Sequence, residues 1–389
     1  MTPSARLRAI PDPAGDAWAV FERAVALKAE GRDVTMLSIG DHDTTTPHPI
    51  LDAMIASARG GHTGYAAMSG TPGLRAAIAE RASLRTGAPL TPEAVLVLPG
   101  GQFALFAALM AVTDPGDAVV LLDPYYATYP LTVRSAGAVP RIAPTRPDAG
   151  FLPDLDTLDA AMSGARALIL NSPNNPTGAV YPRAVMERIA GMAIRHDCTI
   201  ISDEVYDGQV WEGTHLSPRT LPGMAERCIV IGSLSKSHVM TGARLGWLVA
   251  PEGTALALRD LAISTTYGVP GFIQDAAEFA LRDGDAIEAE AAARYRRRRD
   301  LAVEVLAGSP VRVSPPQGGM YLMLDIRPTG LSGIDFAMRL LEETGVATMP
   351  GEGFGKAAAG HLRVALTVAD ERLADALRRL VTFAGTCAD

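Results

Sequence analysis

The chain has 389 residues, of which 48% are hydrophobic and 20% charged, a balance typical of a globular protein with a substantial core. This length favours one large domain accompanied by a smaller one. The formal net charge is −8, and the single basic run, "RYRRRRD" at 294–300, lies in a helical pattern. We interpret that run as a solvated helix face, so nucleic-acid binding is not expected.

The cysteines and the amino-terminal residues argue against a disulfide-rich, zinc-binding, secreted or membrane-spanning protein. The three cysteines are far apart and form no C-x-x-C pair, so we expect neither a disulfide framework nor a zinc site. The first residues lack the apolar region of a signal peptide, and no apolar run is long enough to span a bilayer. The cytoplasm is therefore the expected location.

The first predicted element is a helix near 15–31 that Gly31 ends, within an amino-terminal segment (1–45) expected to pack on the smaller domain. Short apolar runs then alternate with helical patterns such as 101–113 and 183–195. Because several runs are apolar at consecutive positions, they predict strands buried on both faces. These strands are 94–99, 117–123, 166–173, 198–204, 227–233 and 244–251. The alternation predicts an α/β large domain (46–284) with a mainly parallel sheet sandwiched by helices.

The last hundred residues follow a different pattern. A long helix over 285–308 precedes the apolar segment "GMYLMLDI", a helix near 333–344, the strand "HLRVALTV" and a final helix from about 370. This order predicts a smaller α+β domain over 285–389. In an open parallel sheet, ligands bind beyond the carboxyl ends of the strands, so polar residues at those ends are the candidates for a site.

Lys236 follows the strand over 227–233, and it is one of only three lysines among the 35 basic Lys and Arg residues. An exposed loop lysine is the ordinary interpretation of such a position. The alternative is a nucleophile: a guanidinium stays protonated, whereas a lysine amine attacks a carbonyl once burial or a nearby cation lowers its pKa. Arg244, eight residues later, could be that cation.

Two further strands end in polar residues. Asp203 ends the strand over 198–203. It is either a turn or capping residue, or a carboxylate that faces a protonated ring nitrogen. Tyr206 could share the second kind of site. "NSPNNPTG" at 171–178 is a turn by its prolines and glycine, and the amide of Asn175 could donate to a ligand oxygen.

A glycine pair and a buried arginine complete the set. In "LPGGQFALFAAL" (98–109) a strand meets a helix through Gly100 and Gly101, so free N–H groups could hold an anion there. Neither a Walker loop nor a dinucleotide fingerprint occurs. Arg363, inside an apolar strand, needs a partner, which is either a structural carboxylate or the carboxylate of a ligand.

Together these residues describe a site for pyridoxal 5′-phosphate: an anion cradle, a nucleophilic lysine, a carboxylate for a pyridinium nitrogen and polar groups for a phenolic oxygen. "SLSKSHVMTGARLG" resembles the lysine signature of class I/II (fold type I) aminotransferases. "NSPNNPTG", "SDEVY" and "LRVAL" follow the family's order, and "GYAAMSGTPGLR" (64–75) resembles its segment at the dimer interface.

The resemblance implies a role for each matching residue. Lys236 would bind the cofactor aldehyde and act as the catalytic base, and Asp203 would pair with the ring nitrogen. Tyr206 and Asn175 would hold the phenolic oxygen, and Tyr126 would stack on the ring. The expected phosphate ligands are the amides of Gly101 and Gln102, Ser233, Arg244 and, from the neighbouring subunit of a homodimer, Tyr65. The substrate carboxylate would bind Arg363, Gly40 and Asn175.

The resemblance also bears on the substrates, an L-amino acid and a 2-oxo acid. "LPGMAERC", "YGVPGFIQDAA" and "GGMYLMLDIRPTGLS" resemble the arginine–pyruvate transaminase group. Dicarboxylate enzymes of the family often use an arginine from the partner, and no Arg lies within 261–281. The acidic and polar residues expected near the substrate side are Asp16, Asp41, His42 and Asp43, although solvated loop acids are the commoner case.

Two alternatives stay open at this point, and a third is discounted. One is a lyase on the same scaffold, acting for example on carbon–sulfur bonds. A second is an aminotransferase for aromatic or aliphatic donors. A third, a cofactor-binding transcription regulator, would need a basic DNA-binding domain before the family match, and the fewer than fifty residues there are not basic.

Overall fold

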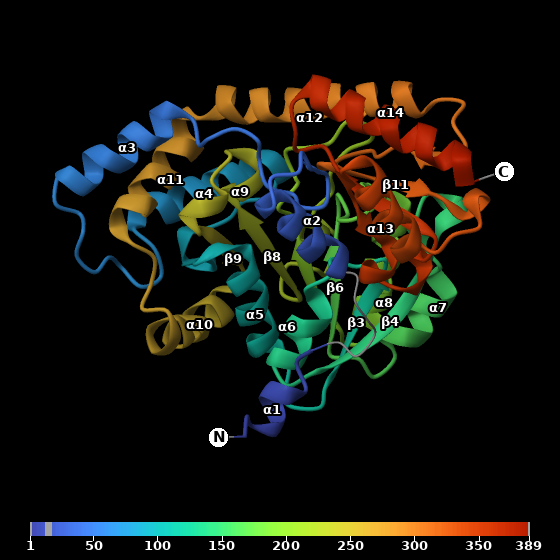
Figure 1. Ribbon diagram of the computed structural model, residues 1–389. Coiled ribbons are helices and arrows are strands. Elements are labelled where there is room, and N and C mark those ends of the chain that lie inside the picture. Colours follow the sequence, from blue (N-terminus) through green and yellow to red (C-terminus); the bar gives the residue numbers. More distant parts are fainter. Residues whose placement is uncertain (1, 12–17, 388–389) are drawn as a thin grey trace.

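A computed structural model describes residues 2–11 and 18–387 of the chain. A large central sheet lies between helices, and a smaller sheet with its own helices lies beside it (Figure 1). The eight strands of the large sheet run in the order β2-β9-β8-β7-β6-β3-β4-β5. Their bounds are β2 (Val95–Leu98), β3 (Ala118–Asp123), β4 (Val139–Arg146), β5 (Leu152–Pro153), β6 (Ala167–Asn171), β7 (Thr199–Asp203), β8 (Cys228–Ser233) and β9 (Gly246–Val249).

The pairing confirms a mainly parallel sheet at its centre. β4, β3, β6, β7 and β8 are joined in parallel, whereas β9 pairs antiparallel with both β8 and β2. All six predicted strands are present within two residues at each end. The segment 139–146 was not predicted, because its two prolines remove ladder donors and mask the pattern of a strand. That strand pairs on one side with only the two-residue β5, so the loss of donors is tolerated there.

Helices cover both faces of the large sheet. Side chains of α5 (Gly100–Val112) and α6 (Tyr129–Ser135) pack on one face, and those of α7 (Leu155–Met162) and α8 (Arg183–Arg195) pack on the other. Residues of one strand alternate between the two cores, as Leu121 and Val120 of β3 do. The other helices of this part are α3 (His48–Arg59), α4 (Pro72–Thr86), α9 (Leu234–Ser237), α10 (Glu252–Thr265) and α11 (Gly271–Asp283).

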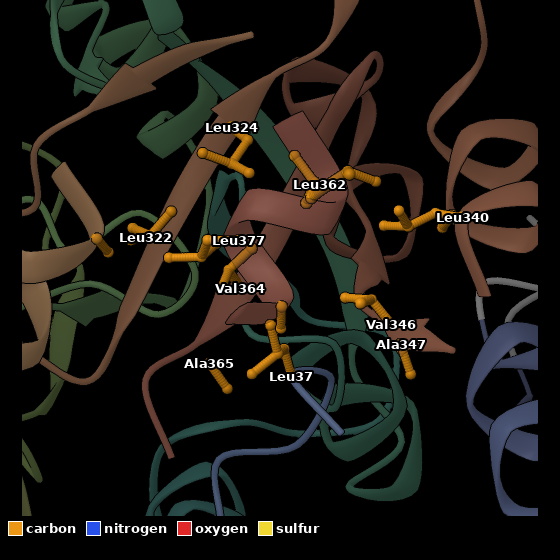
Figure 2. Packing of buried hydrophobic residues seen from close by; sticks show 14 of the residues in the cluster. Leu37, Leu322, Leu324, Leu340, Val346, Ala347, Leu362, Val364, Ala365 and Leu377 are labelled. Carbon is orange, nitrogen blue, oxygen red and sulfur yellow. The ribbon is translucent and has the colours of Figure 1, made fainter. Parts of the chain in front are cut away.

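The smaller sheet is antiparallel, in the order β10-β11-β14-β13. Figure 2 shows its core, where Leu322, Leu324, Leu362 and Val364 of the sheet meet Leu377 of the last helix. The elements here are β10 (Arg312–Ser314), β11 (Tyr321–Asp325), β12 (Val346–Ala347), β13 (Met349–Pro350), β14 (His361–Ala365), α12 (Asp285–Leu306), α13 (Gly333–Thr344) and α14 (Asp370–Cys387). The long helix, the middle helix and the final helix thus lie close to their predicted positions.

The amino-terminal segment joins this smaller unit. β1 (Thr35–Met36) pairs in parallel with β12, and Leu37 belongs to the core in Figure 2. α1 (Ala5–Arg8) precedes it, and α2 (Ala19–Ala29) ends shortly before Gly31, whose φ of 88° favours glycine. The predicted start of α2 falls partly outside the described residues. The domain boundaries at 45 and 284 stay predictions.

One expectation about the surface was wrong. The basic run at 294–300 is not wholly solvated, because Arg298 is buried at 4% exposure. Its guanidinium binds the carboxylates of Asp43 and Asp370 and the carbonyl oxygen of Leu366. A helical arginine pattern does not reveal that the segment before α3 passes over one of its positions. Among the described helices, none is both long and apolar enough to cross a membrane.

Candidate active site

The carboxyl ends of β6, β7 and β8 open into a cavity of about 450 Å³ between the two units of the fold. Every residue with a predicted cofactor-binding, catalytic or substrate-carboxylate role, except Tyr65, lines it. The predicted residues at its wall are Gly40, Gly101, Gln102, Tyr126, Asn175, Asp203, Tyr206, Ser233, Lys236, Arg244 and Arg363. The structure therefore brings together groups that are up to 323 positions apart in the chain, from Gly40 to Arg363.

Lys236 lies in the single turn of α9, directly after β8. Its Nζ donates a hydrogen bond of 2.6 Å to the carbonyl oxygen of Gly40. A side chain at position 40 could not be accommodated, since a Cβ there would lie 1.7 Å from the hydroxyl oxygen of Tyr321. The glycine thus lets the backbone approach both the lysine amine and the smaller sheet.

Asp203 ends β7 as a partly buried carboxylate. Its Oδ2 accepts a 2.6 Å hydrogen bond from the hydroxyl of Tyr129, and its Oδ1 accepts one of 3.3 Å from the backbone N–H of Val205. Burial raises the pKa of this carboxyl above its usual range, while the two hydrogen bonds oppose that rise. Among the described residues, no cationic side chain forms a salt bridge with the Asp203 carboxylate. A protonated ring nitrogen would therefore supply the missing positive charge.

The anion cradle forms where α5 begins. Gly100 has a φ of 83°, and a Cβ on it would lie 2.5 Å from Nη2 of Arg244. Arg244 itself adopts a left-handed backbone (φ 50°), and its Nη1 donates to the carbonyl of Thr241 at 2.8 Å. Ser233 accepts from the N–H of Ser235 and donates to Leu245 O. These groups fit the phosphate of the predicted cofactor.

Gln102 and Tyr126 both line the cavity. The side-chain amide of Gln102 bonds to the hydroxyls of Thr128 and Thr132, which leaves its backbone N–H at the helix start for a ligand. Tyr126 meets Tyr129 edge to face, with ring centroids 5.6 Å apart. The aromatic wall required for a pyridine ring is therefore present.

Arg363 reaches the cavity from β14 and is 4% exposed. Its Nη1 donates to Oδ1 of Asn175 at 3.0 Å and its Nη2 to the carbonyl of Ser38 at 2.5 Å. The guanidinium lies between the rings of Tyr321 and Phe354, 4.3 Å and 4.5 Å from their centroids. Its Nε is buried without a partner. No carboxylate of the described residues pairs with it, so the structural salt bridge is not found.

Asn175 and Tyr206 complete the polar wall. Because Oδ1 of Asn175 accepts from Arg363, its amide nitrogen is left to donate. Asn171 holds this loop, since its Oδ1 accepts from Asn175 N and its Nδ2 donates to Asp203 O. Tyr206 is 4% exposed and its pKa is raised by burial and by the neighbouring Tyr321, with which its hydroxyl shares a hydrogen bond.

Sequence reasoning missed Tyr129 and Tyr321. Tyr129 stands three residues after Tyr126, and its backbone N–H donates to the carbonyl of Tyr126 at 2.9 Å, so a turn that precedes α6 brings the two rings together. Tyr321 lies in an apolar strand segment, where a tyrosine indicates packing as readily as a ligand contact. Its contact with Arg363 depends on the register of β11 against β14, which no local pattern reveals.

Of the four residues expected near the substrate, only Asp41 is found at the cavity wall of the described structure. Asp41 lines the cavity, and its Oδ1 accepts from Thr241 Oγ1 at 2.9 Å. His42 does not line it: Nε2 meets Ser235 O at 2.9 Å and Nδ1 meets the Tyr295 hydroxyl at 2.6 Å. Burial lowers the pKa of His42 to about 4, so this ring is neutral at pH 7. Asp43 is held by Arg298, and Asp16 lies outside the described residues.

Tyr65 lies away from the cavity of its own chain. Its side chain is 85% exposed and packs edge to face on Tyr267, with centroids 4.8 Å apart. The contact of Tyr65 with a neighbouring subunit stays a prediction.

Known proteins match this chain over nearly its whole length. The family model described as aminotransferase class I and II matches residues 32–380. The arginine–pyruvate transaminase AruH of Pseudomonas aeruginosa is 45% identical over 95% of this chain and 96% of its own length. The aspartate/prephenate aminotransferase of Thermus thermophilus is 38% identical over 94% and 95% of the two chains. A solved structure, the Thermus thermophilus aspartate aminotransferase with maleate, has a TM-score of 0.92 at 36% identity, covering 98% of this chain and all of the other.

The lysine after β8, the buried carboxylate at the end of β7 and the anion cradle at α5 agree with the cofactor of that family. The chain therefore belongs to the class I and II aminotransferases, and it is a pyridoxal-phosphate-dependent transaminase of fold type I.

Proposed function

We propose that this aminotransferase transfers the α-amino group of arginine to pyruvate. The name of the Pseudomonas aeruginosa relative, 45% identical over 95% of this chain, supports this pair of substrates. Relatives named for aspartate and prephenate are less similar, at 39% and 38% identity.

The charges at the cavity wall favour a cationic donor, and this is the observation that carries the proposal. Among the described residues, the cations at the wall are Lys236, Arg244 and Arg363. Each has a proposed partner in the cofactor or in the substrate α-carboxylate, so none remains for a second carboxylate of the substrate. Of the wall carboxylates, Asp203 faces the ring nitrogen in this scheme. Asp41 remains, exposed and next to the backbone of Gly40.

The proposed residue roles are those that the family resemblance implies, and their shared place at one cavity wall supports them. The amides of Gly101 and Gln102, with Ser233 and Arg244, would hold the phosphate. Tyr126 would pack on the ring and Asp203 would pair with its nitrogen, while Tyr206 and Asn175 would hold its phenolic oxygen. Pyridoxal phosphate supplies an aldehyde for an amine and a ring that accepts electrons. Arg363 binds the substrate carboxylate through paired N–H groups.

Lys236 moves the proton in this scheme. Its amine would hold the cofactor aldehyde in the absence of substrate. The free amine then takes the proton from the substrate α-carbon as a general base and later returns it as a general acid. Gly40 O, which accepts from Nζ at 2.6 Å, orients the amine at the cavity wall.

We also propose a homodimer in which Tyr65 reaches the phosphate of the neighbouring subunit. The resemblance of 64–75 to the interface segment of the family and the exposed pair of Tyr65 and Tyr267 support it. A cytoplasmic location stays a prediction.

A panel of amino donors tests the substrate proposal. Arginine, alanine and aspartate are each assayed with pyruvate and with 2-oxoglutarate. We expect the highest kcat/KM for arginine with pyruvate. If arginine is no better than alanine or aspartate, the donor proposal is wrong while the family stands. Release of pyruvate and ammonia without an oxo-acid acceptor would instead indicate the lyase alternative.

A further inference from the structure

Asp123 is a buried carboxylate at the end of β3 that lies outside the cavity wall. It is 3% exposed. Its Oδ2 accepts from the backbone N–H of Lys356 at 2.9 Å, and both of its oxygens accept from the N–H of Ala357 at 3.1 Å. The carboxylate thus binds the start of the short 3-10 helix Lys356–Ala358, which belongs to the loop between β13 and β14.

Residues on both segments, the loop and the end of β3, fit this contact. Gly355 has a φ of 121°, and a Cβ there would lie 2.2 Å from Oδ1 of Asp123. Two residues after Asp123, the N–H of Tyr125 donates to the carbonyl of Phe354 at 2.9 Å. The end of β3 and the loop 351–358 are therefore joined by backbone hydrogen bonds and by a carboxylate.

This junction holds two parts of the active site. Tyr126, at the cavity wall, follows the β3 end directly, and Phe354, 1% exposed, is carried by the loop 351–358. The Phe354 ring covers one face of the Arg363 guanidinium at 4.5 Å. Release of the loop would remove one of the two rings between which Arg363 is held.

We propose that Asp123 is a positioning residue for the substrate-carboxylate site: it latches the loop 351–358 to the large sheet and so keeps Phe354 against Arg363. This inference concerns binding of any amino or oxo acid substrate, and it does not depend on arginine as the donor. It goes beyond the transaminase reaction itself, since Asp123 touches neither the cavity nor its proposed ligands.

The ionised form of Asp123 makes the stronger latch, because a carboxylate accepts from two N–H groups more strongly than a neutral carboxyl does. Burial raises the pKa of Asp123 to about 6, against the opposing effect of the two N–H groups and the charge of Lys356. Gly355 of the loop and Pro144, the partner of Asp123 in β4, do not titrate. At pH 7 the carboxyl is therefore mostly ionised, and the two N–H groups bind a carboxylate.

The test compares the holoenzyme with Asp123→Asn, which imitates the protonated form. We expect KM for both the amino donor and the oxo acid to rise about fivefold, with kcat changed by less than about twofold. Amide hydrogen exchange in peptides covering 351–358 should be faster in the variant.

Asp325→Asn is the matched control. Asp325 is also a buried carboxylate at the end of a strand, and it accepts from the backbone N–H of Arg327 at 3.0 Å without contact to the cavity wall. We expect its KM values to stay within about twofold of wild type. An equal rise in both variants would overturn the proposal, because general destabilisation would then explain it.

Two further variants keep the proposal testable if Asp123→Asn does not fold. Gly355→Ala pushes on the same contact from the loop side and should raise KM in the same way. Phe354→Leu should raise KM, and its combination with Gly355→Ala should add little if both act through Arg363. Unchanged KM in Gly355→Ala, or full additivity of the pair, would contradict the latch.

Discussion

The hydroxyl of Tyr129 donates a 2.6 Å hydrogen bond to Oδ2 of Asp203, so the first residue of α6 supports the last residue of β7. Because this bond stabilises the ionised carboxylate, it counters part of the rise in the Asp203 pKa that burial causes. We predict that Tyr129→Phe raises that pKa further and weakens cofactor binding about fivefold, the equivalent of about 1 kcal/mol.

Cofactor release followed by absorbance measures this effect. The ring of phenylalanine keeps the packing on Tyr126, so the change isolates the hydroxyl. Tyr181→Phe, a buried tyrosine outside the cavity wall, is the control and should leave cofactor affinity unchanged. Equal affinity in wild type and Tyr129→Phe would show that the hydroxyl does not support Asp203.

The second prediction concerns donor selectivity. If Asp41 faces the guanidinium of the donor, Asp41→Asn should lower kcat/KM for arginine about tenfold, since it removes one charge-assisted contact. kcat/KM for alanine should change by less than about twofold. Asp52→Asn makes the same change of net charge at an exposed position in α3 and should affect neither donor. A parallel loss for arginine and alanine would assign Asp41 to the structure of the site instead.

The third prediction concerns stability below neutral pH. The folded-state pKa of His42 is lowered by burial to about 4, whereas an unfolded histidine binds its proton near pH 6.5. Between these values the unfolded state binds more protons, so the free energy of unfolding falls as the pH falls from about 6.5 to 4. Between pH 7 and pH 5, we expect the free energy of unfolding to fall by about 1–2 kcal/mol less in His42→Gln than in wild type.

Urea unfolding at both pH values gives this difference. His48→Gln, at an exposed position, should behave like wild type. If wild type and His42→Gln lose equal stability on acidification, the buried neutral ring is not a source of the acid sensitivity.

Much of the fold could be predicted from the sequence because its strands are buried on both faces. In β6 and β2 every residue is buried, and continuous apolar runs mark such strands without any knowledge of their neighbours. β4 was not predicted, because Pro140 and Pro144 interrupt its pattern of strand-forming residues. Its place beside β3 is set by tertiary packing.

The same reasoning separates the site residues that were predicted from those that were not. Asp203 ends β7 and Lys236 lies three residues after the end of β8, so the rule for parallel sheets brings them to one cavity. Tyr321 and Asp123 act across the two units of the fold, where contacts depend on how the smaller sheet sits on the larger one. His42 was expected near the substrate, yet Tyr295 of α12 and Ser235 of α9 hold its ring away from the cavity.

The central claim is that Lys236 carries the cofactor and moves the proton. Borohydride reduction of the holoenzyme, followed by peptide mass analysis, tests it directly. We predict one cofactor label per chain, located on Lys236, with neither Lys28 nor Lys356 labelled, and no measurable transamination by Lys236→Ala. A label on another residue, or full transamination by Lys236→Ala, would contradict the account.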